Sequence, residues 1–210
     1  MRPRALLIGA TGPMGRAVLA RAGESGVDVR AFARRPETLA GVAEDVVGGD
    51  VQQVETIASA LSGIDTVVSV LGSRPRSSSP HLLEDGTRNI VAAMTTRGLR
   101  RLLCVTGMGA GDSRGHGPWW YDALVRPTIL RSVYADKERQ EEVVRRSGLE
   151  WTIVRPAVLA ESRADRVVRA EVALAPGEKM RSLTRDDVAR FLLTEVRRPA
   201  HVGQTVHLFT

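Results

Sequence analysis

The chain has 210 residues and a formal net charge of +6, and it is long enough to bury one core. Its arginines are scattered along the sequence and no apolar run is long enough to cross a bilayer, so we expect neither a nucleic-acid interface nor a membrane span. The four histidines lack the spacing of metal ligands, so we predict no metal site. A strand pattern begins close to the N-terminus, without the apolar run of a signal peptide, which favours a cytoplasmic location.

The first 33 residues carry the strongest pattern in the chain. Residues 4–8 predict a buried strand, residues 12–22 a helix and residues 27–33 a second strand. Glycines in the connecting segment permit a tight turn, leave room for a pyrophosphate and let the helix pack close to the strand. This arrangement predicts a dinucleotide site whose contacts include Gly9, Thr11, Gly12, Pro13, Met14 and Gly15. A strand-to-helix turn that binds no ligand remains the alternative.

The end of the second predicted strand indicates which dinucleotide binds. A chain that binds NAD would place Asp or Glu about 20 residues after the glycines, to accept hydrogen bonds from the ribose hydroxyls. Arg34 and Arg35 stand there instead. Because two guanidinium groups suit a 2′-phosphate, we predict NADP(H) as the cofactor. The alternative is a solvated basic loop ahead of Pro36.

Strands and helices continue to alternate along the chain. Strands are predicted at residues 46–50 (with their loop), 66–71, 101–106, 151–154 and 205–209, and helices at 51–61, 83–97, 137–147 and about 185–196. A charged, strand-like segment covers residues 167–174. The fold class is therefore α/β, a Rossmann-type doubly wound parallel sheet with helices on both faces. We expect one domain, with a dinucleotide-binding core at residues 1–156 and a small substrate-side extension at residues 157–210 that completes the sheet and the pocket.

Residues 107–131 interrupt this alternation. They follow the carboxyl end of the fifth predicted strand, the edge at which open parallel sheets bind ligands. Their aromatic side chains could stack on a flat substrate, and those predicted as substrate contacts are Trp119, Trp120 and Tyr121. The alternative is that these side chains anchor a surface loop to the core. Within the preceding strand, Cys104 is predicted to be a buried residue and not a nucleophile.

Several further segments occur in a recognisable order, namely residues 49–51, 71–74, 86–94 and 147–156. Together with the glycine segment, they resemble an atypical, extended branch of the short-chain dehydrogenase/reductase superfamily, the NAD(P)-binding proteins similar to biliverdin IXβ reductase (flavin reductase) and NmrA-like proteins. The resemblance implies that the adenine is contacted by Asp50 and Val51. It also implies that the nicotinamide ribose and ring lie beside Leu71, Gly72, Ser73, Arg155, Pro156 and Ala157. For Asp50, a cap on the following helix is an alternative or additional role.

The sequence departs from this family where chemistry would occur. A typical short-chain dehydrogenase uses Tyr-x-x-x-Lys, in which the lysine lowers the pKa of the tyrosine. Neither Tyr121 nor Tyr134 has a lysine four residues on. By resemblance, the serine and the pocket histidine of biliverdin IXβ reductase correspond to Gly107 and Val158. We therefore do not predict biliverdin as the substrate. Val158 and Met108 are predicted to contact a substrate, and Gly107 the cofactor.

Three polar residues remain as candidates for catalysis. Lys137 is predicted to be the general acid, or to position a water or the ribose hydroxyls, and Thr106 and Tyr134 are predicted to be secondary hydrogen-bond donors. Thr106 and Lys137 are also predicted cofactor contacts. For Lys137, an ion pair with Glu141 on an exposed helix face is the alternative.

The function predicted from these residues is an NADPH-dependent reductase that transfers a hydride to a small conjugated or aromatic acceptor. Flavins, quinones, tetrapyrroles and secondary-metabolite carbonyls belong to this class. One alternative is a non-catalytic, NADP(H)-sensing regulator of the NmrA-like kind, and another is an isomerase or epimerase with bound NADP. We expect a small-molecule substrate as the partner, and a monomer or a homodimer.

Overall fold

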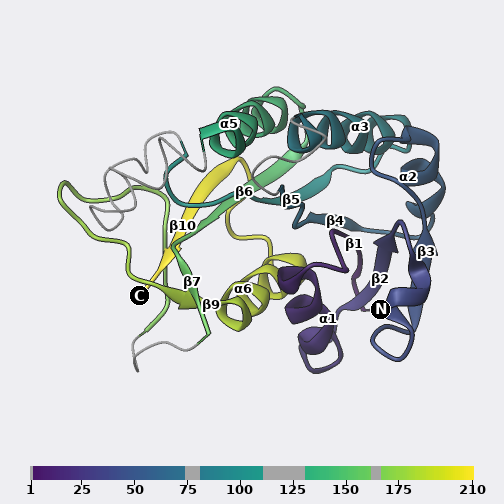
Figure 1. Ribbon diagram of the computed structural model, residues 1–210, viewed down its shortest axis with the longest axis horizontal. Coiled ribbons are helices and arrows are strands. Elements are labelled where there is room, and N and C mark those ends of the chain that lie inside the picture. Colours follow the sequence, from purple (N-terminus) through teal and green to yellow (C-terminus); the bar gives the residue numbers. More distant parts are fainter. Residues whose placement is uncertain (1, 74–80, 111–130, 162–166) are drawn as a thin grey trace.

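The computed structural model describes residues 2–73, 81–110, 131–161 and 167–210 (Figure 1). Its centre is an eight-stranded sheet. In sheet order the strands are β3 (Asp45–Gly48), β2 (Asp28–Ala33), β1 (Arg4–Ile8), β4 (Thr66–Ser69), β5 (Arg101–Val105), β6 (Glu150–Pro156), β10 (Gln204–Phe209) and β8 (Arg169–Glu171). All neighbours pair in parallel except β8, which is antiparallel to β10.

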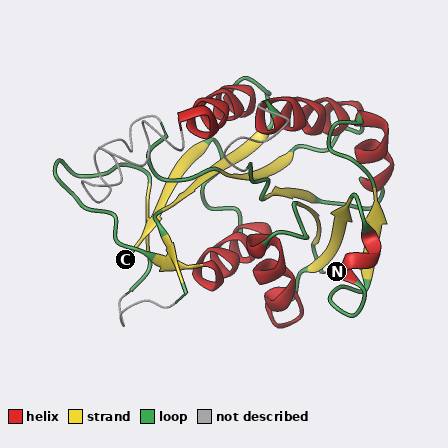
Figure 2. Ribbon diagram, in the orientation of Figure 1, coloured by secondary structure: helices red, strands yellow, loops and turns green. Residues whose placement is uncertain are grey.

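Helices cover both faces of this sheet, as Figure 2 shows. On one face lie α1 (Pro13–Ser25) and α6 (Arg185–Arg197), and on the other lie α2 (Val54–Ala60), α3 (Leu82–Thr96) and α5 (Arg131–Arg145). Successive residues of β1 point to opposite faces, so that Leu7 joins the core of the first face while Leu6 and Ile8 join that of the second. The predicted α/β class and doubly wound sheet are confirmed.

The C-terminal part of the chain adds strands at one edge of the sheet. The prediction of a final strand is confirmed by β10, which pairs with β6. Within the charged segment 167–174, only residues 169–171 form a strand, β8. Short elements that the sequence pattern did not predict are the 3₁₀ helix η1 (Pro36–Leu39) and the two-stranded pair β7 (Leu159–Ala160) and β9 (Leu183–Thr184).

The helices α3, α5 and α6 show how far local signals determine helix ends. A capping box at Thr184 and Asp187 starts α6, in agreement with the predicted start at residue 185. Gly98 follows α3 with a φ of 69°, a conformation that glycine adopts without strain, and the predicted end is confirmed. In contrast, α5 begins at Arg131 and not at Lys137. This earlier start places Tyr134 and Lys137 on the same helix.

The order of strands creates a switch point between β1 and β4. From β1 the chain moves outward through β2 and β3, and it then returns to the other side of β1 to form β4. Ligands of open α/β sheets bind at such a point, outside the carboxyl ends of the strands. The glycine turn begins there, because Gly9 has a φ of 91° and a Cβ at this position would lie 2.8 Å from the carbonyl oxygen of Val70.

The prediction that Gly15 lets α1 pack close to β1 is confirmed and leads to a stability test. A Cβ on Gly15 would lie 2.4 Å from the carbonyl oxygen of Gly9 and 2.5 Å from Cα of Ala10. Because both atoms belong to the main chain, Gly15→Ala is expected to destabilise the fold by about 3 kcal/mol. Urea denaturation measures this change.

The matched control for that experiment lies in the same helix. A Cβ on Gly23 would meet no atom of the described residues within 4 Å, and Gly23→Ala is expected to stabilise the protein by about 0.5–1 kcal/mol through helix propensity. Equal urea midpoints for the two variants would contradict the close-packing role of Gly15.

The structure also tests two predictions about residue environment. Cys104 is fully buried in β5, as predicted, and burial raises the pKa of its thiol to about 12. Such a thiol is inert at neutral pH. Among the described residues, no helix is both long and apolar enough to cross a membrane.

Candidate cofactor and active site

The N-terminus of α1 lies directly after the glycine turn at the switch point. Gly12 is its N-cap, with no side-chain hydrogen bond, and the first turn contains no acidic residue. A Cβ on Gly12 would meet only the carbonyl oxygen of Gly9, at 3.4 Å. The first main-chain N–H groups and the positive end of the helix dipole are therefore left to an anionic group. This geometry fits the pyrophosphate of a dinucleotide.

Arginines gather at the end of β2. Arg34 and Arg35 are both exposed, and neither side chain has a hydrogen bond or ion pair within the described ranges. Arg16 reaches the same turn from α1, where its Nη2 donates to the carbonyl oxygen of Thr38 at 3.2 Å. We did not predict a role for Arg16 from the sequence, although its position directly after Gly15 could have suggested one. Together these arginines form a positive surface that fits a phosphate.

The turn after β3 contains the two residues expected at the adenine. The carboxylate of Asp50 accepts a hydrogen bond from the main-chain N–H of Gln52 at 3.0 Å. Because α2 has Gln53 as its N-cap, without a side-chain cap, the alternative that Asp50 caps this helix is wrong. Val51 is 7% exposed, and its carbonyl oxygen accepts from Nδ2 of Asn89 at 3.0 Å. Asn89, which we did not single out from the sequence, thus holds this turn against α3.

The segment after β4 lies beside this turn. A Cβ on Gly86 of α3 would be 3.1 Å from Cγ2 of Val51 and 3.3 Å from Cδ1 of Leu71. Because Gly86 has no side chain, Val51 and Leu71 can both pack against α3 at this position. Gly72, the next residue, is exposed. The predicted adenine and ribose segments consequently lie next to each other, while their contacts with a cofactor remain predictions.

Lys137 reaches from α5 to the carboxyl end of β5. Its Nζ donates to the carbonyl oxygen of Thr106 at 2.9 Å and lies 5.2 Å from the ring centroid of Tyr134. Burial lowers the pKa of this amine to about 8, although the charge of Glu141 opposes the change. The alternative of an exposed ion pair is wrong, because Glu141 is only 1% exposed and Lys137 points toward the sheet.

Gly107 makes room for this amine. A Cβ at position 107 would lie 2.8 Å from Nζ of Lys137. Because position 107 has no side chain, the amine lies at the end of β5 without this close contact. Gly107 and Lys137, two predicted site residues, are thus brought together.

The hydroxyl groups of Thr106 and Tyr134, the other two candidates for catalysis, donate hydrogen bonds within the protein. Thr106 donates from Oγ1 to Oε1 of Glu141 at 2.7 Å. Tyr134 donates to the carbonyl oxygen of Met108 at 2.6 Å. Met108 itself is 3% exposed and packs in the core. The proposed roles of these three residues toward a substrate remain predictions, and the hydrogen bonds show how each residue is held.

A buried ion pair lies behind Thr106. Arg155 donates from Nε to Oε1 of Glu141 at 2.9 Å and from Nη2 to Oε2 at 2.7 Å, and both side chains are 1% exposed. Burial would raise the pKa of Glu141, but the hydrogen bonds and charge of Arg155, with Thr106 and Arg145, hold this pKa below its usual range. From the resemblance we predicted Arg155 only as a residue beside the nicotinamide, and not as a partner of Glu141. No local sequence pattern indicates a pair between residues on different elements.

The turn after β6 is tied to the rest of the sheet. The carbonyl oxygen of Pro156 accepts from the main-chain N–H of Met108 at 2.9 Å, and the N–H of Ala157 donates to the carbonyl oxygen of Leu208 at 2.8 Å. Val158 is half-buried and accepts from the N–H of Leu183 at 3.3 Å. These main-chain groups are already paired, and contact of the turn with a nicotinamide remains a prediction. The predicted contacts Trp119, Trp120 and Tyr121 lie outside the described residues.

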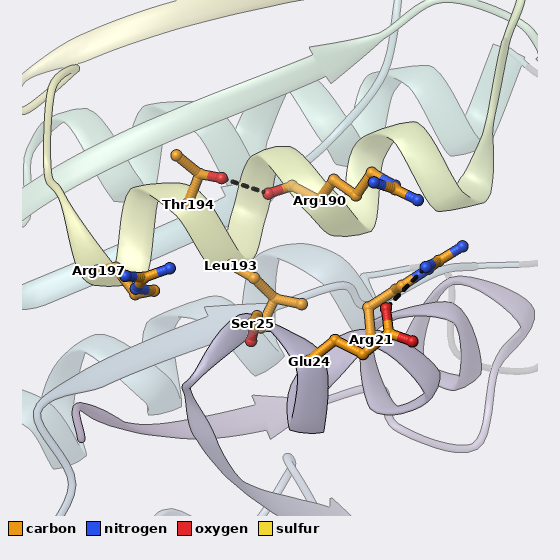
Figure 3. A pocket seen from close by; sticks show the side chains of 7 residues that line it. All are labelled: Arg21, Glu24, Ser25, Arg190, Leu193, Thr194 and Arg197. Atoms are coloured by element: carbon orange, nitrogen blue, oxygen red, sulfur yellow. Dashed lines mark hydrogen bonds and ion pairs between the residues drawn. The ribbon is translucent and has the colours of Figure 1, made fainter.

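Two other groups of polar side chains lie outside this region. A surface hollow of about 260 Å³ lies between α1 and α6 (Figure 3) and is lined by Arg21, Glu24, Ser25, Arg190, Leu193, Thr194 and Arg197. Arg21 pairs with Glu24, and both Arg21 and Arg190 pair with Asp186. This hollow lies at the C-terminal part of α1, away from the glycine turn. Several of the charged side chains that line this hollow are thus paired with one another or with Asp186.

The second cluster contains ligand types that a metal could use. His81, Glu84 and Asp136 have atoms within 4.8 Å of one another. However, Asp136 accepts hydrogen bonds from the main-chain N–H groups of Leu83 and Glu84, which start α3. Arg139 donates to Glu84 at 2.7 Å and lies 3.2 Å from Nδ1 of His81. The guanidinium group of Arg139 thus places a positive charge beside Glu84 and His81. The cluster is therefore a cap of α3 together with ion pairs.

The fold, the open helix N-terminus at the switch point and the arginines beyond β2 define a dinucleotide-binding α/β protein. The chain belongs to the NAD(P)H-binding family, whose model matches residues 9–199. This assignment confirms the resemblance inferred from the sequence.

Characterised and uncharacterised proteins are similar in sequence to this chain. The chain is 27% identical over 201 residues to the uncharacterized sugar epimerase YhfK of Bacillus subtilis, covering 92% of this chain and 87% of the relative. It is 29% identical over 209 residues to (4-alkanoyl-5-oxo-2,5-dihydrofuran-3-yl)methyl phosphate reductase of Streptomyces griseus, covering 95% of this chain and 65% of that enzyme.

Solved structures agree on the fold. A provisional NAD-dependent epimerase/dehydratase from Bacillus halodurans superposes with a TM-score of 0.82 at 26% identity, covering 99% of this chain and 94% of the other. The anaerobilin reductase ChuY from Escherichia coli O157:H7 superposes with a TM-score of 0.80 at 23% identity, covering 98% and 96%. At the latter identity the superposition shows the fold alone.

Proposed function

We propose that this protein is an NADPH-dependent reductase that transfers a hydride to a small conjugated or aromatic acceptor. The observation that carries the proposal is the position of the Lys137 amine, held by the carbonyl oxygen of Thr106 beside Gly107. This amine lies at the carboxyl edge of the sheet, the edge on which the glycine turn opens. A partly buried cation with a shifted pKa at this edge indicates a chemical role.

In this proposal the phosphate groups of the cofactor are held by α1 and by the arginines beyond β2. The N-terminus of α1 would hold the pyrophosphate, while Arg34 and Arg35 would bind the 2′-phosphate and favour NADPH over NADH. When bound, NADPH supplies the hydride. The chain orients the acceptor and excludes water from it.

Lys137 would supply the proton that accompanies reduction. With a pKa of about 8, the amine is mostly protonated at neutral pH and is still acidic enough to donate. The carbonyl oxygen of Thr106 directs one N–H bond and leaves the others for an acceptor or a bridging water. The ring of Tyr134 lies beside the same amine, with its centroid 5.2 Å from Nζ.

The relatives support a reductase without identifying its substrate. The Streptomyces griseus relative is by name a reductase of a conjugated furanone phosphate. Its similarity extends over 95% of this chain. A conjugated acceptor is therefore the class we propose.

The test is NADPH oxidation by the purified protein at neutral pH, with FMN, riboflavin, a simple quinone and biliverdin as separate acceptors. Titrations of NADPH and NADH binding accompany the assay. Turnover of a flat acceptor supports the reductase. Tight NADP(H) binding without turnover of any acceptor contradicts it.

A cofactor-sensing regulator is the second candidate function. It is favoured by the hydroxyl groups of Thr106 and Tyr134, which are hydrogen-bonded within the protein instead of pointing to a substrate. An epimerase with bound NADP is the third candidate, suggested by the name of the Bacillus subtilis relative. Net consumption of NADPH with any acceptor argues against both, because neither a sensor nor an epimerase uses up the cofactor.

Position 107 provides a direct test of the Lys137 geometry. Gly107→Ala would place a Cβ 2.8 Å from Nζ and push the amine away from Thr106. Because misplacement of a reacting group by about 1 Å can cost about 100-fold in rate, we expect turnover to fall by about 10- to 100-fold. NADPH affinity should fall by less, although Gly107 is itself a predicted cofactor contact. The unfolding midpoint is measured alongside. Full activity in this variant would contradict the proposed position of the proton donor.

A further inference from the structure

The buried pair of Glu141 and Arg155 is not used by the proposed mechanism. Both side chains are 1% exposed, and they form a two-point contact at 2.9 and 2.7 Å. Charged groups buried this deeply are costly unless their hydrogen-bonding atoms find partners. The other oxygen contacts of Glu141 come from Thr106 and Arg145. Both carboxylate oxygens of Glu141 therefore accept hydrogen bonds.

This pair connects the elements that surround Lys137. Glu141 lies on α5, four residues after Lys137 and so about one helical turn away. Arg155 belongs to β6, and Thr106 directly follows β5. The Thr106 side chain is held by Glu141, and its carbonyl oxygen holds the Lys137 amine. One residue thus links the buried carboxylate to the candidate proton donor.

We propose that Glu141, held by Arg155, is a positioning residue that fixes Thr106 so that its carbonyl oxygen keeps the Lys137 amine at the carboxyl end of β5. The inference rests on the proposed function for the role of that amine in the reaction. Glu141 touches neither the acceptor nor the cofactor in this arrangement, so it acts through Thr106 and Lys137.

The charges around the amine determine how it responds to loss of Glu141. Groups that act on this cluster are Arg155 from β6, Cys104 and Thr106 from β5 and its end, and Arg145 and Tyr134 from α5. Burial lowers the pKa of Lys137 to about 8, and the negative charge of Glu141 limits that decrease. Glu141→Gln keeps the shape of the side chain and removes this charge, so the pKa of Lys137 should fall further.

The experiment measures the reactivity of Lys137 without requiring turnover. The chain has two lysines, Lys137 and the exposed Lys179, which serves as an internal reference. Each variant is labelled with trace acetic anhydride across a pH series, and the labelled peptides are quantified by mass spectrometry. Only the neutral amine reacts. In Glu141→Gln, we expect the midpoint for Lys137 to fall by about one pH unit.

Turnover and a matched control complete the test. With an active acceptor, Glu141→Gln should reduce kcat by about tenfold without a change in NADPH affinity, and the alkaline decline of kcat/KM should move to lower pH. Glu142→Gln makes the same chemical change at an exposed neighbour on α5 that pairs with Arg146. This control should behave as the unmodified protein does. An unchanged labelling midpoint and unchanged turnover in Glu141→Gln overturn the inference.

A second pair of variants keeps the test valid if Glu141→Gln does not fold. Thr106→Val leaves the Glu141–Arg155 pair but removes the hydroxyl that Glu141 holds, and Thr106→Ser restores it. We expect faster labelling of Lys137 in the valine variant and a return to the original rate in the serine variant. Equal rates in all three proteins overturn the inference. A labelling change without turnover of any acceptor would count against the proposed function alone.

Discussion

Lys137→Met is expected to reduce kcat for acceptor reduction by about 100- to 1,000-fold, which lies within the range of about 100- to 10,000-fold that general acid catalysis contributes. Methionine has similar length and no proton to donate. Lys137 is also a predicted cofactor contact, so NADPH binding should weaken, but by less than kcat falls, because the pyrophosphate and the 2′-phosphate lie at α1 and β2 in the proposed complex. The measurement is steady-state kinetics with the most active acceptor. Lys179→Met removes the same charge from an exposed position and is the control.

The pH profile gives an independent check on the same residue. A general acid works in its protonated form, so activity is retained below the pKa of Lys137 and lost above it. Since burial lowers this pKa to about 8, kcat/KM of the unmodified protein should decline as pH rises through about 8. The Lys137→Met variant should lack this decline. A flat profile across that pH range in the unmodified protein would rule out Lys137 as the proton donor.

Replacement of both Arg34 and Arg35 by alanine is expected to weaken NADPH binding by about 100-fold. Each guanidinium–phosphate hydrogen bond contributes about 1.5–3 kcal/mol, and the lower value applies here because both side chains are exposed, so that the two together contribute about 3 kcal/mol. Both side chains are otherwise without partners within the described ranges. Binding of NADH, which lacks the 2′-phosphate, should be nearly unaffected. Isothermal titration calorimetry at constant ionic strength measures both affinities.

The replacement of Arg34 and Arg35 has a matched control, and one result would contradict the predicted role of these two arginines. Arg97→Ala removes an exposed guanidinium at the C-terminal end of α3, on the opposite edge of the sheet, and should leave both affinities unchanged. Rising salt should weaken NADPH binding more than NADH binding in the unmodified protein, because the extra phosphate charge is screened. If the unmodified protein binds NADH as tightly as NADPH, the assignment of the two arginines is wrong.

Local patterns predicted the first strand and the helix that follows it. The strand over residues 4–8 matches β1, and the glycine spacing is explained by atoms that the structure places close together. Gly15 lies against the main chain of Gly9 and Ala10, and only glycine fits there. These features could be predicted because they depend on hydrophobic periodicity and on contacts between residues close in sequence.

The start of α5 could not be predicted in the same way. The helix begins at Arg131, in a segment without an acidic residue in its first turn, so the usual N-terminal signals are missing. Its packing against α3 provides an explanation: Asp136 caps α3, and Gln140 donates to Thr87 at 3.0 Å. Long-range contacts thus stabilise a helix start that local propensity does not mark.

The sequence by itself determined the fold class, the dinucleotide turn and the arginines beyond β2, because each depends on residue spacing along one or two neighbouring elements. Only the tertiary structure decided what surrounds Lys137. Glu141 is 35 positions from Thr106 and 14 from Arg155, and the three residues meet because α5 packs beside the ends of β5 and β6. Whether a charged side chain is buried and paired depends on what the fold places around it, and the sequence pattern of a single helix does not contain that information.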